Sequence, residues 1–178
     1  TWEDCILKAP SGIHINWPWM AIANHKWEKR SAEKQKTDIQ DQLIELDDFF
    51  DSSREYMVAR DNNKSKAIDM KFESMIPLLN GEIPAFIHAN RIEQIESAIY
   101  FSKNQRIKMV LVGGADSWMA TDLLKDNDIA VIYEHPLSTP MRRWEPYDIK
   151  YTVPNKLYNA GVKFCISSSS STFEAPHQ

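Results

Sequence analysis

Four short polar segments, each directly after an apolar run, are the places where this sequence could carry chemistry. The segments are His88, Asn90 and Arg91; Gly113, Gly114 and Asp116; Glu134 and His135; and Ser167 to Ser171. The apolar runs before them have the length of buried strands. In parallel α/β folds, functional side chains gather at the carboxyl ends of the strands. We therefore expect these four segments to converge on one site.

His88 has the residue type best suited to catalysis. It ends the apolar run 83–88, where a neutral imidazole could ligate a metal ion or transfer a proton. The alternative is a histidine that is hydrogen-bonded into the top of the core. Position alone leaves both interpretations open.

The segment from Gly113 to Asp116 stands between a predicted strand and a predicted helix. Its backbone N–H groups could bind an anion. It lacks the third, spaced glycine of a dinucleotide-binding fingerprint. A tight turn with Asp116 as the helix N-cap is the alternative. The serine run lacks the flanking glycines of a nucleophile elbow, and we expect it to be a loop.

A long polar segment with four prolines, residues 134–154, follows the third predicted strand. Loops of this length often form lids or binding sites. Arg142 and Arg143 within it could receive a carboxylate or phosphate group, since guanidinium groups bind such anions in pairs of hydrogen bonds. They could equally be solvated.

The elements that must position these residues differ between the two parts of the chain. Residues 1–82 are predicted to be mainly helical, with a helix over 37–60 that begins in a capping box at Thr37 and a second over 68–80. Residues 83–168 alternate strands and helices, with strands predicted at 83–88, 108–112, 128–133 and 162–167. Strands separated by helices favour parallel pairing. The fold class is therefore α/β.

Composition narrows the class of protein. A formal net charge of -4 argues against a nucleic-acid binder. No apolar run approaches the roughly 20 residues of a membrane span. The two cysteines, Cys5 and Cys165, are too few for a disulfide framework or a cysteine-rich zinc site, and their apolar neighbours predict buried thiols. The chain begins at Thr1 without a Met and ends in a stretch typical of a loop, so we expect a piece of a longer protein. No targeting segment is visible in it, and both a cytoplasmic and a periplasmic location in a bacterium stay open.

Several stretches resemble imidazolonepropionase-like amidohydrolases. Ile83-Pro84-Ala85-Phe86-Ile87-His88-Ala89-Asn90-Arg91 is similar to the fifth strand of that barrel and the start of the next helix, and Asn159-Ala160-Gly161-Val162-Lys163-Phe164-Cys165-Ile166-Ser167 to the eighth strand. Between them, 110–118 and 129–132 resemble the intervening units in the right order. The resemblance covers about residues 68–168. It implies that residues 1–178 are a single fragment, the C-terminal portion, of a TIM-barrel-like (β/α)8 domain.

The resemblance also implies an activity and a cofactor. Such proteins hydrolyse carbon–nitrogen bonds of cyclic amides or related substrates with a metal-activated water. Their usual metal ligands are an H-x-H pair on the first strand, single histidines on the fifth and often the sixth strand, and an aspartate on the eighth. Only His88 matches. Val112-Gly113-Gly114 and Ser167-Ser168 stand at the other two positions. We therefore expect a divalent metal, zinc above all, in the whole protein if it is active, no tight metal binding by this segment, and a divergent or inactive member.

The remaining expectations concern individual residues and partners. His135 and Arg91 are candidate catalytic residues. The candidate substrate-binding residues are Asn90, Arg91, Gly113, Gly114, His135 and Arg142. A different hypothesis is a self-sufficient α/β module that binds an anionic metabolite at Gly113–Gly114 and Arg142–Arg143. We expect a small-molecule substrate, no nucleic acid, no membrane span, and a homo-oligomer formed through exposed strand edges.

Overall fold

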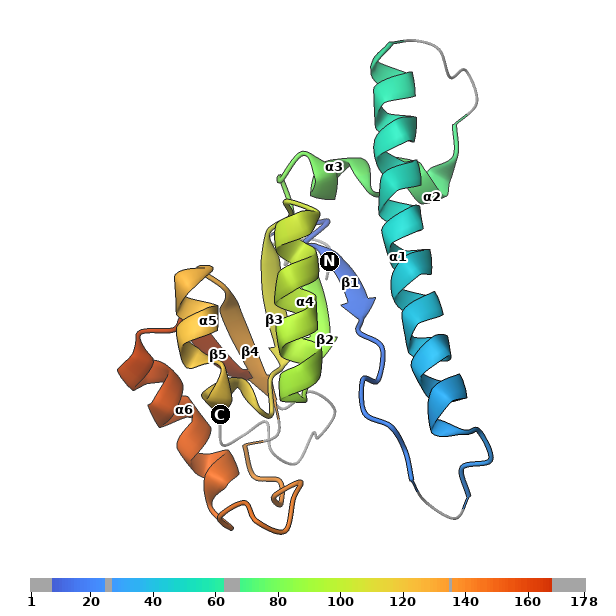
Figure 1. Cartoon of the computed structure of the whole chain (residues 1–178). Helices are drawn as coiled ribbons and strands as arrows, with labels where there is room; N and C mark the ends of the chain where they lie inside the picture. Colours follow the sequence, from blue (N-terminus) through green and yellow to red (C-terminus); the bar gives the residue numbers. More distant parts are fainter. Residues whose placement is uncertain (1–7, 25–26, 63–67, 135, 168–178) are drawn as a thin grey trace, which may run out of the picture. The chain divides into compact units, whose positions relative to one another are not determined.

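The computed structural model describes residues 8–24, 27–62, 68–134 and 136–167 (Figure 1). The predictions made for Cys5, His135 and Ser168 to Ser171 lie outside these residues. The chain divides into two compact units. The first comprises Thr1–Ile13, Pro18–Ala85 and Gln105–Lys108, and the second comprises His14–Trp17, Phe86–Asn104 and Met109–Gln178.

A five-stranded sheet with the order β1-β2-β3-β4-β5 forms the centre of the second unit. Its strands are β1 (Ile13–Asn16), β2 (Ala85–Ala89), β3 (Met109–Gly113), β4 (Ala130–Glu134) and β5 (Phe164–Ser167). Neighbouring strands run parallel, as the register of β3 with β4 and of β4 with β5 shows. The predicted α/β class is confirmed. Strand β1 was not predicted, because four residues of alternating burial leave little pattern in a region that is otherwise helical.

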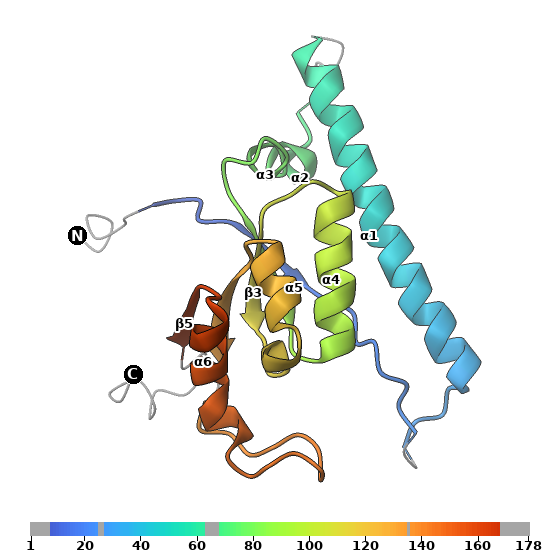
Figure 2. The same cartoon turned by 60° about the vertical axis from the view of Figure 1, so that its left-hand side comes forward.

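The connecting helices of the second unit lie on one face of its sheet (Figures 1 and 2). They are α4 (Ile92–Asn104), η2 (Ser117–Met119), α5 (Thr121–Asp126) and α6 (Ile149–Ala160). Right-handed crossovers between strands in sequential order require this arrangement. Strand β2 accordingly alternates between residues buried under the helices, such as Ile87, and half-buried residues, such as Phe86 and His88.

The other face of the sheet is covered by no described helix of the second unit. We call it the open face. Strand alternation and the register of the paired strands assign to it His14, Asn16, Phe86, His88, Val110, Val112, Ala130, Ile132, Glu134, Cys165 and Ser167. Cys165 is an exposed free thiol, so the expectation that it is buried was wrong. The reason is that its strand places it on the face that no helix of the unit covers.

Under the helices the core is closely packed. Ile95, Leu111, Val131 and Leu157 are at most 1% exposed. The Tyr133 hydroxyl reaches from β4 to donate a hydrogen bond to the Lys150 carbonyl in α6 at 3.0 Å, and burial raises the pKa of this phenol. Helix α6 begins at Ile149, inside the segment 134–154 that was expected to be a loop. It ends at Gly161, whose φ of 76° is the left-handed conformation that commonly follows a helix.

The first unit contains α1 (Ala32–Asp61), α2 (Met70–Glu73) and α3 (Ile76–Leu79). Ser31 caps α1 by accepting a hydrogen bond from the Lys34 N–H, so the predicted capping box at Thr37 was wrong. The Thr37 hydroxyl donates to the Glu33 carbonyl inside the helix. The single helix predicted over 68–80 is two short helices, because Pro77 lies in the first turn of α3 and cannot continue a preceding helix.

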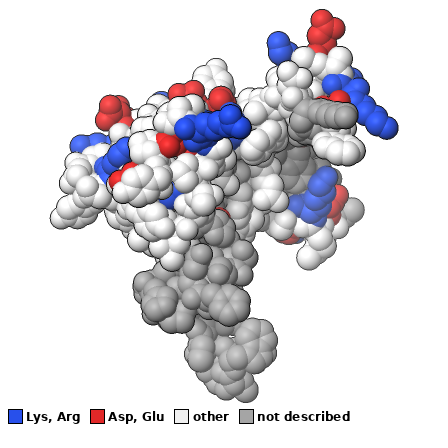
Figure 3. Space-filling view, turned by 90° about the horizontal axis from the view of Figure 1, so that it is seen from below, with Lys and Arg blue, Asp and Glu red and all other residues white. Residues whose placement is uncertain are grey.

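Two further observations concern helix length and surface charge. Among the described residues, no helix combines the length and the apolar character that crossing a bilayer requires. On the face shown in Figure 3, lysine and arginine side chains lie beside aspartate and glutamate side chains. That face therefore presents mixed charge and not a continuous basic surface.

Candidate functional site

Two histidines from neighbouring strands meet on the open face. His14 Nδ1 lies 2.9 Å from His88 Nε2, a hydrogen-bond distance whose donor depends on the tautomers. The two ring centroids are 5.2 Å apart, and the His14 ring also stacks on Phe86 with a centroid distance of 5.0 Å. His88 was the predicted site residue, and His14 was missed.

Trp17 positions His14 by fastening the end of β1 to β2 and α4. The backbone N–H of Trp17 donates to the His88 carbonyl at 3.1 Å. The backbone carbonyl of Trp17 accepts a 3.3 Å hydrogen bond from Gln94 Nε2. The indole ring is 5% exposed and packs edge-on against Phe101. The only sequence signal for His14 was the apolar alternation Ile13-His14-Ile15, since it fell in a part of the chain predicted to be helical.

The surroundings of His88 favour its neutral form. Desolvation by burial lowers its pKa, and the neighbouring His14 lowers it further, while the Glu134 carboxylate raises it. The net shift is downward from 6.5. A neutral imidazole has a free lone pair that can accept a proton or coordinate a metal ion.

The Gly113–Gly114 loop closes onto the end of β2. The Gly114 N–H donates to the Ala89 carbonyl at 2.9 Å, and the Asp116 N–H donates to the Asn90 carbonyl at 2.9 Å. The Ala115 N–H donates to Asn90 Oδ1 at 3.3 Å. These N–H groups therefore bind protein oxygens, as in the tight turn considered as the alternative. A substrate-binding role for Asn90, Gly113 and Gly114 stays a prediction.

Asp116 stands at the N-cap position of η2, as the tight-turn alternative predicts, but its side chain makes no cap hydrogen bond there. Its Oδ2 instead accepts a hydrogen bond from the Ile92 N–H at 3.0 Å, at the start of α4. The carboxylate thus fixes the helix that follows His88 in the chain.

Arg142 binds the same carboxylate from the long loop. Its two terminal nitrogens donate to Asp116 at 2.9 and 2.6 Å, in a bidentate pair. One of them also donates to Glu145 Oε1 at 2.7 Å. The Arg142 side chain is 17% exposed and those of Asp116 and Glu145 are 1% exposed. Arg142 is therefore not solvated, and its predicted role toward a substrate anion remains untested.

Charges around this cluster balance one another. Burial acts to raise the pKa of Glu145, but hydrogen bonds from Arg142 and from the Met141 N–H hold it below its usual value. The Asp116 hydrogen bond raises the pKa of Arg142. Burial lowers the pKa of Lys150, which is 3% exposed. We call Asp116, Arg142 and Glu145 the loop cluster, because they tie the loop after β4 to the ends of β2 and β3.

Two further predicted residues, Arg91 and Arg143, are described by their own surroundings. Arg91 donates from Nε and from a terminal nitrogen to its neighbour Glu93 at 3.3 and 3.4 Å. Arg143 is exposed. Hydrogen bonds thus connect the predicted residue Asn90 with the Gly113–Gly114 loop, and Asp116 connects that loop with Arg142. His88 instead contacts His14, which the sequence did not suggest.

The described residues do not complete the metal centre that the resemblance implies. Among them, no group of three or more histidine, cysteine, aspartate and glutamate side chains could hold a metal ion. Val112 and Gly113 on β3 and Ser167 on β5 stand where further ligands are expected. His88 contacts one other potential ligand, His14. A complete centre would need donors from outside these residues.

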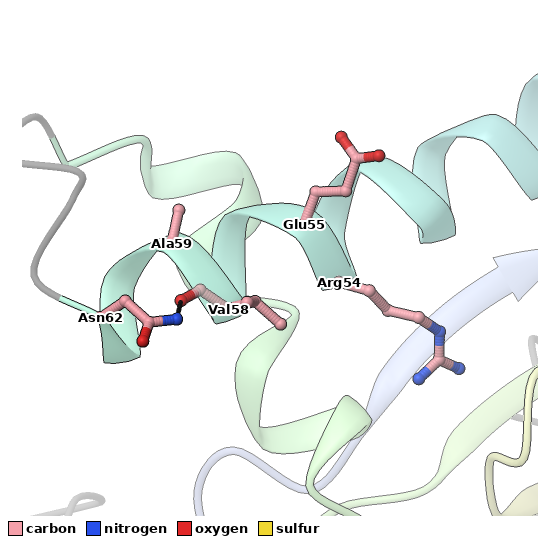
Figure 4. Close-up of a pocket in the computed structure, with 5 residues that line it drawn as sticks. All are labelled: Arg54, Glu55, Val58, Ala59 and Asn62. Atoms are coloured by element: carbon pink, nitrogen blue, oxygen red, sulfur yellow. Dashed lines mark hydrogen bonds between the residues drawn. The ribbon is translucent and has the colours of Figure 1, made fainter.

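The first unit has an open groove of about 390 Å³ along the end of α1. It is lined by Arg54, Glu55, Val58, Ala59 and Asn62, which Figure 4 shows on successive turns of that helix. The Asn62 side chain donates to the Val58 carbonyl at 2.7 Å, and the Arg54 guanidinium donates to the Gln105 carbonyl. The groove contains none of the predicted site residues.

Comparison with known proteins gives one informative result. No protein-family model matches the chain, and no curated protein matches it either. A solved structure, an amidohydrolase from Thermotoga maritima MSB8, is similar with a TM-score of 0.73 and 21% sequence identity. The similarity covers 96% of this chain and 45% of that one, so the chain spans less than half of the length of the protein it resembles. This likeness confirms a fold of parallel strand–helix units like those of an amidohydrolase barrel.

Proposed function

We propose that this chain is part of an amidohydrolase-like protein that hydrolyses a non-peptide carbon–nitrogen bond in a cyclic amide or a related compound. The reaction takes place at the open face, with His14 and His88 at its centre. The observation that carries the proposal is the 2.9 Å contact between the two imidazoles. It lies on a sheet whose fold is similar to that of the Thermotoga maritima amidohydrolase.

The chemistry follows from the state of the two rings. Neutral His88 can take a proton from an attacking water and return it to the departing nitrogen, which is the role of a general acid–base group. His14 orients the His88 ring through their shared hydrogen bond. The Glu134 carboxylate, which raises the pKa of His88 electrostatically, favours the protonated ring that forms during the reaction.

A divergent active site accounts for the ligand set. The imidazolonepropionase-like resemblance implies a divalent metal, zinc above all, yet the described residues do not complete a site for it. In our proposal any such ion takes further ligands from the rest of the whole protein. This chain by itself is then expected to be inactive.

Association with another copy is part of the proposal. Strands β1 and β5 are the two edges of the described sheet, and sheet edges readily pair with other chains. We expect the isolated chain to form a homo-oligomer through them. Light scattering coupled to size-exclusion chromatography would test this, and a monomer at high concentration would contradict it.

The proposed activity can be tested with the whole protein. It would be incubated with a panel of lactams, hydantoins and related cyclic amides, and ring opening would be followed by absorbance. We expect at least one substrate, with hydrolysis about 100-fold slower in His88→Asn, the order of magnitude lost with a general acid–base group. His177→Asn is the control histidine substitution. No hydrolysis across the panel, or an unaffected His88→Asn variant, would contradict the proposal.

A further inference from the structure

We propose that helix α6 joins two copies of this chain in a two-fold symmetric dimer. The copies meet through exposed aromatic side chains of α6 and of the loop before it (Figure 1). We call these side chains the aromatic surface; they are Trp144, Tyr147, Tyr151 and Tyr158. The inference is independent of the proposed hydrolysis, because the aromatic surface contains none of the candidate site residues. It also differs from association through the edges of the sheet.

The two sides of α6 differ in burial. Ile149, Val153 and Leu157 follow one another at intervals of four residues, and they are at most 3% exposed. Tyr151 and Tyr158 lie about half a turn away from that stripe, because each residue advances an α-helix by about 100° around its axis. These two tyrosines are 55% and 74% exposed. The outer side of the helix therefore presents aromatic rings to solvent.

Two further exposed aromatic side chains come just before α6. Tyr147, next to the N-cap residue Asp148, is 85% exposed, and Trp144 is 64% exposed. Four aromatic side chains of about 150–250 Å² each, exposed to these extents, leave on the order of 500 Å² of aromatic surface uncovered. A homodimer interface of standard size takes about 800 Å² from each copy, of which about two thirds is apolar. The aromatic surface alone thus supplies the apolar area that a stable dimer needs.

The outer side of α6 presents no charge that would keep two copies apart. The helix has two charged side chains, Lys150 and Lys156. Lys150 is 3% exposed, and the Lys156 ammonium lies over the Trp118 ring, 4.1 Å from its centre. Surface helices typically carry charged and polar residues opposite the buried stripe, whereas the centres of protein interfaces are depleted of charge and enriched in tyrosine and tryptophan. The composition of α6 is therefore that of an interface helix.

The spacing of the tyrosines fits a two-fold axis. Tyr151 and Tyr158 are about 10.5 Å apart along the helix, and the exposed Asn155 lies between them on the same side. Two antiparallel copies of α6 that cross near Asn155 place each Tyr151 opposite Tyr158 of the partner subunit, as a self-complementary interface requires. An asparagine amide both donates and accepts hydrogen bonds, so Asn155 is suited to face Asn155 of the partner subunit. A second copy of the chain is the occupant that these features fit.

Sedimentation equilibrium of the 178-residue chain tests the inference. The variants are Tyr158→Ala, which removes a central ring, and Asn155→Glu, which brings two carboxylates together at the axis. Both positions are exposed, and circular dichroism would verify that each variant is folded. Tyr100→Ala is the matched control, because Tyr100 on α4 is 69% exposed and lies outside the aromatic surface.

We expect the wild type and the control to dimerise alike and Asn155→Glu to be monomeric. Tyr158→Ala should raise the dissociation constant of the dimer at least about 30-fold, the loss typical of a central aromatic residue of an interface. A monomeric wild type would overturn the inference and would leave the aromatic surface to a different partner. Variants that associate as the wild type does would also overturn it, and would assign the association to the edges β1 and β5.

Discussion

Gly113 and Asn90 approach each other so closely that only glycine fits at position 113. A Cβ atom there would lie 2.6 Å from Asn90 Oδ1. Gly113 also has a φ of 94°, which residues with a Cβ rarely adopt. This approach lets Asn90 accept the Ala115 N–H. The end of β2, next to His88, is thereby joined to the end of β3.

We therefore predict that Gly113→Ala destabilises the protein through both causes. The positive φ costs about 1–2 kcal/mol for alanine, and the forced contact adds about 1–3 kcal/mol. Urea unfolding followed by circular dichroism measures the sum.

Gly81→Ala is the matched control. Gly81 has a φ of 74°, but nothing lies within 4 Å of the position of its Cβ. It should show the backbone cost alone. Equal losses of free energy in the two variants would mean that the approach to Asn90 has no energetic consequence.

Arg142→Ala is expected to be strongly destabilising. It leaves the buried carboxylates of Asp116 and Glu145 without their guanidinium partner, and loss of one partner from a buried ion pair costs about 3–5 kcal/mol. The comparison is Lys163→Ala, because the Lys163–Asp128 pair has side chains that are 74% and 81% exposed. Exposed pairs contribute about 0–1 kcal/mol. Similar free energies of unfolding for both variants would show that the loop cluster does not stabilise the loop.

Acid should weaken the same cluster. The pKa of Glu145 in the folded protein lies below its ordinary value of 4.5, so the folded state binds the proton less readily than the unfolded state does. Its contribution to stability is complete above about pH 4.5 and is lost as the pH falls through the folded pKa. The free-energy difference between wild type and Glu145→Gln should therefore shrink below pH 4.5. A difference that is constant from pH 7 to pH 3 would contradict this assignment.

Phosphate binding separates the two hypotheses drawn from the sequence. The N–H groups of Gly114, Ala115 and Asp116 bind protein oxygens, and Arg142 binds two carboxylates. We therefore expect 10 mM inorganic phosphate, a concentration on the order of weak anion binding, to leave the melting temperature unchanged. A rise in melting temperature that Lys163→Ala does not alter but Arg142→Lys abolishes would favour the anion-binding module.

Periodicity and turn residues were sufficient to predict most of the sheet. The runs ending at His88, Val112, Tyr133 and Ser167 are long and apolar because helices cover one side of each strand. Strand β1 escaped prediction since Ile13–Asn16 has only two half-buried positions. Helix α1 begins at Ala32, five residues before the expected Thr37, because Ser31 supplies a cap that composition does not distinguish from Thr37.

The site was only partly predictable for a different reason. Asn90, Gly113 and Gly114 lie at strand ends, so a general rule about parallel sheets selects them. The partnership of His14 with His88 joins residues 74 positions apart in the sequence, and no spacing rule selects such a pair. Likewise, the pairing of Arg142 with Asp116 depends on the path of the loop after β4. From the sequence alone, Arg142 could equally be solvated or bind an anionic ligand.

The measurement that tests the account most directly is a double-mutant cycle on hydrolysis by the whole protein. It compares kcat/KM for the wild type, His14→Asn, His88→Asn and the double variant. Because the two imidazoles are proposed to act as one unit, each single variant should lose nearly as much activity as the double variant. Losses that simply add, or a His14→Asn variant with wild-type kcat/KM, would contradict the central claim that the contact between His14 and His88 is the functional centre.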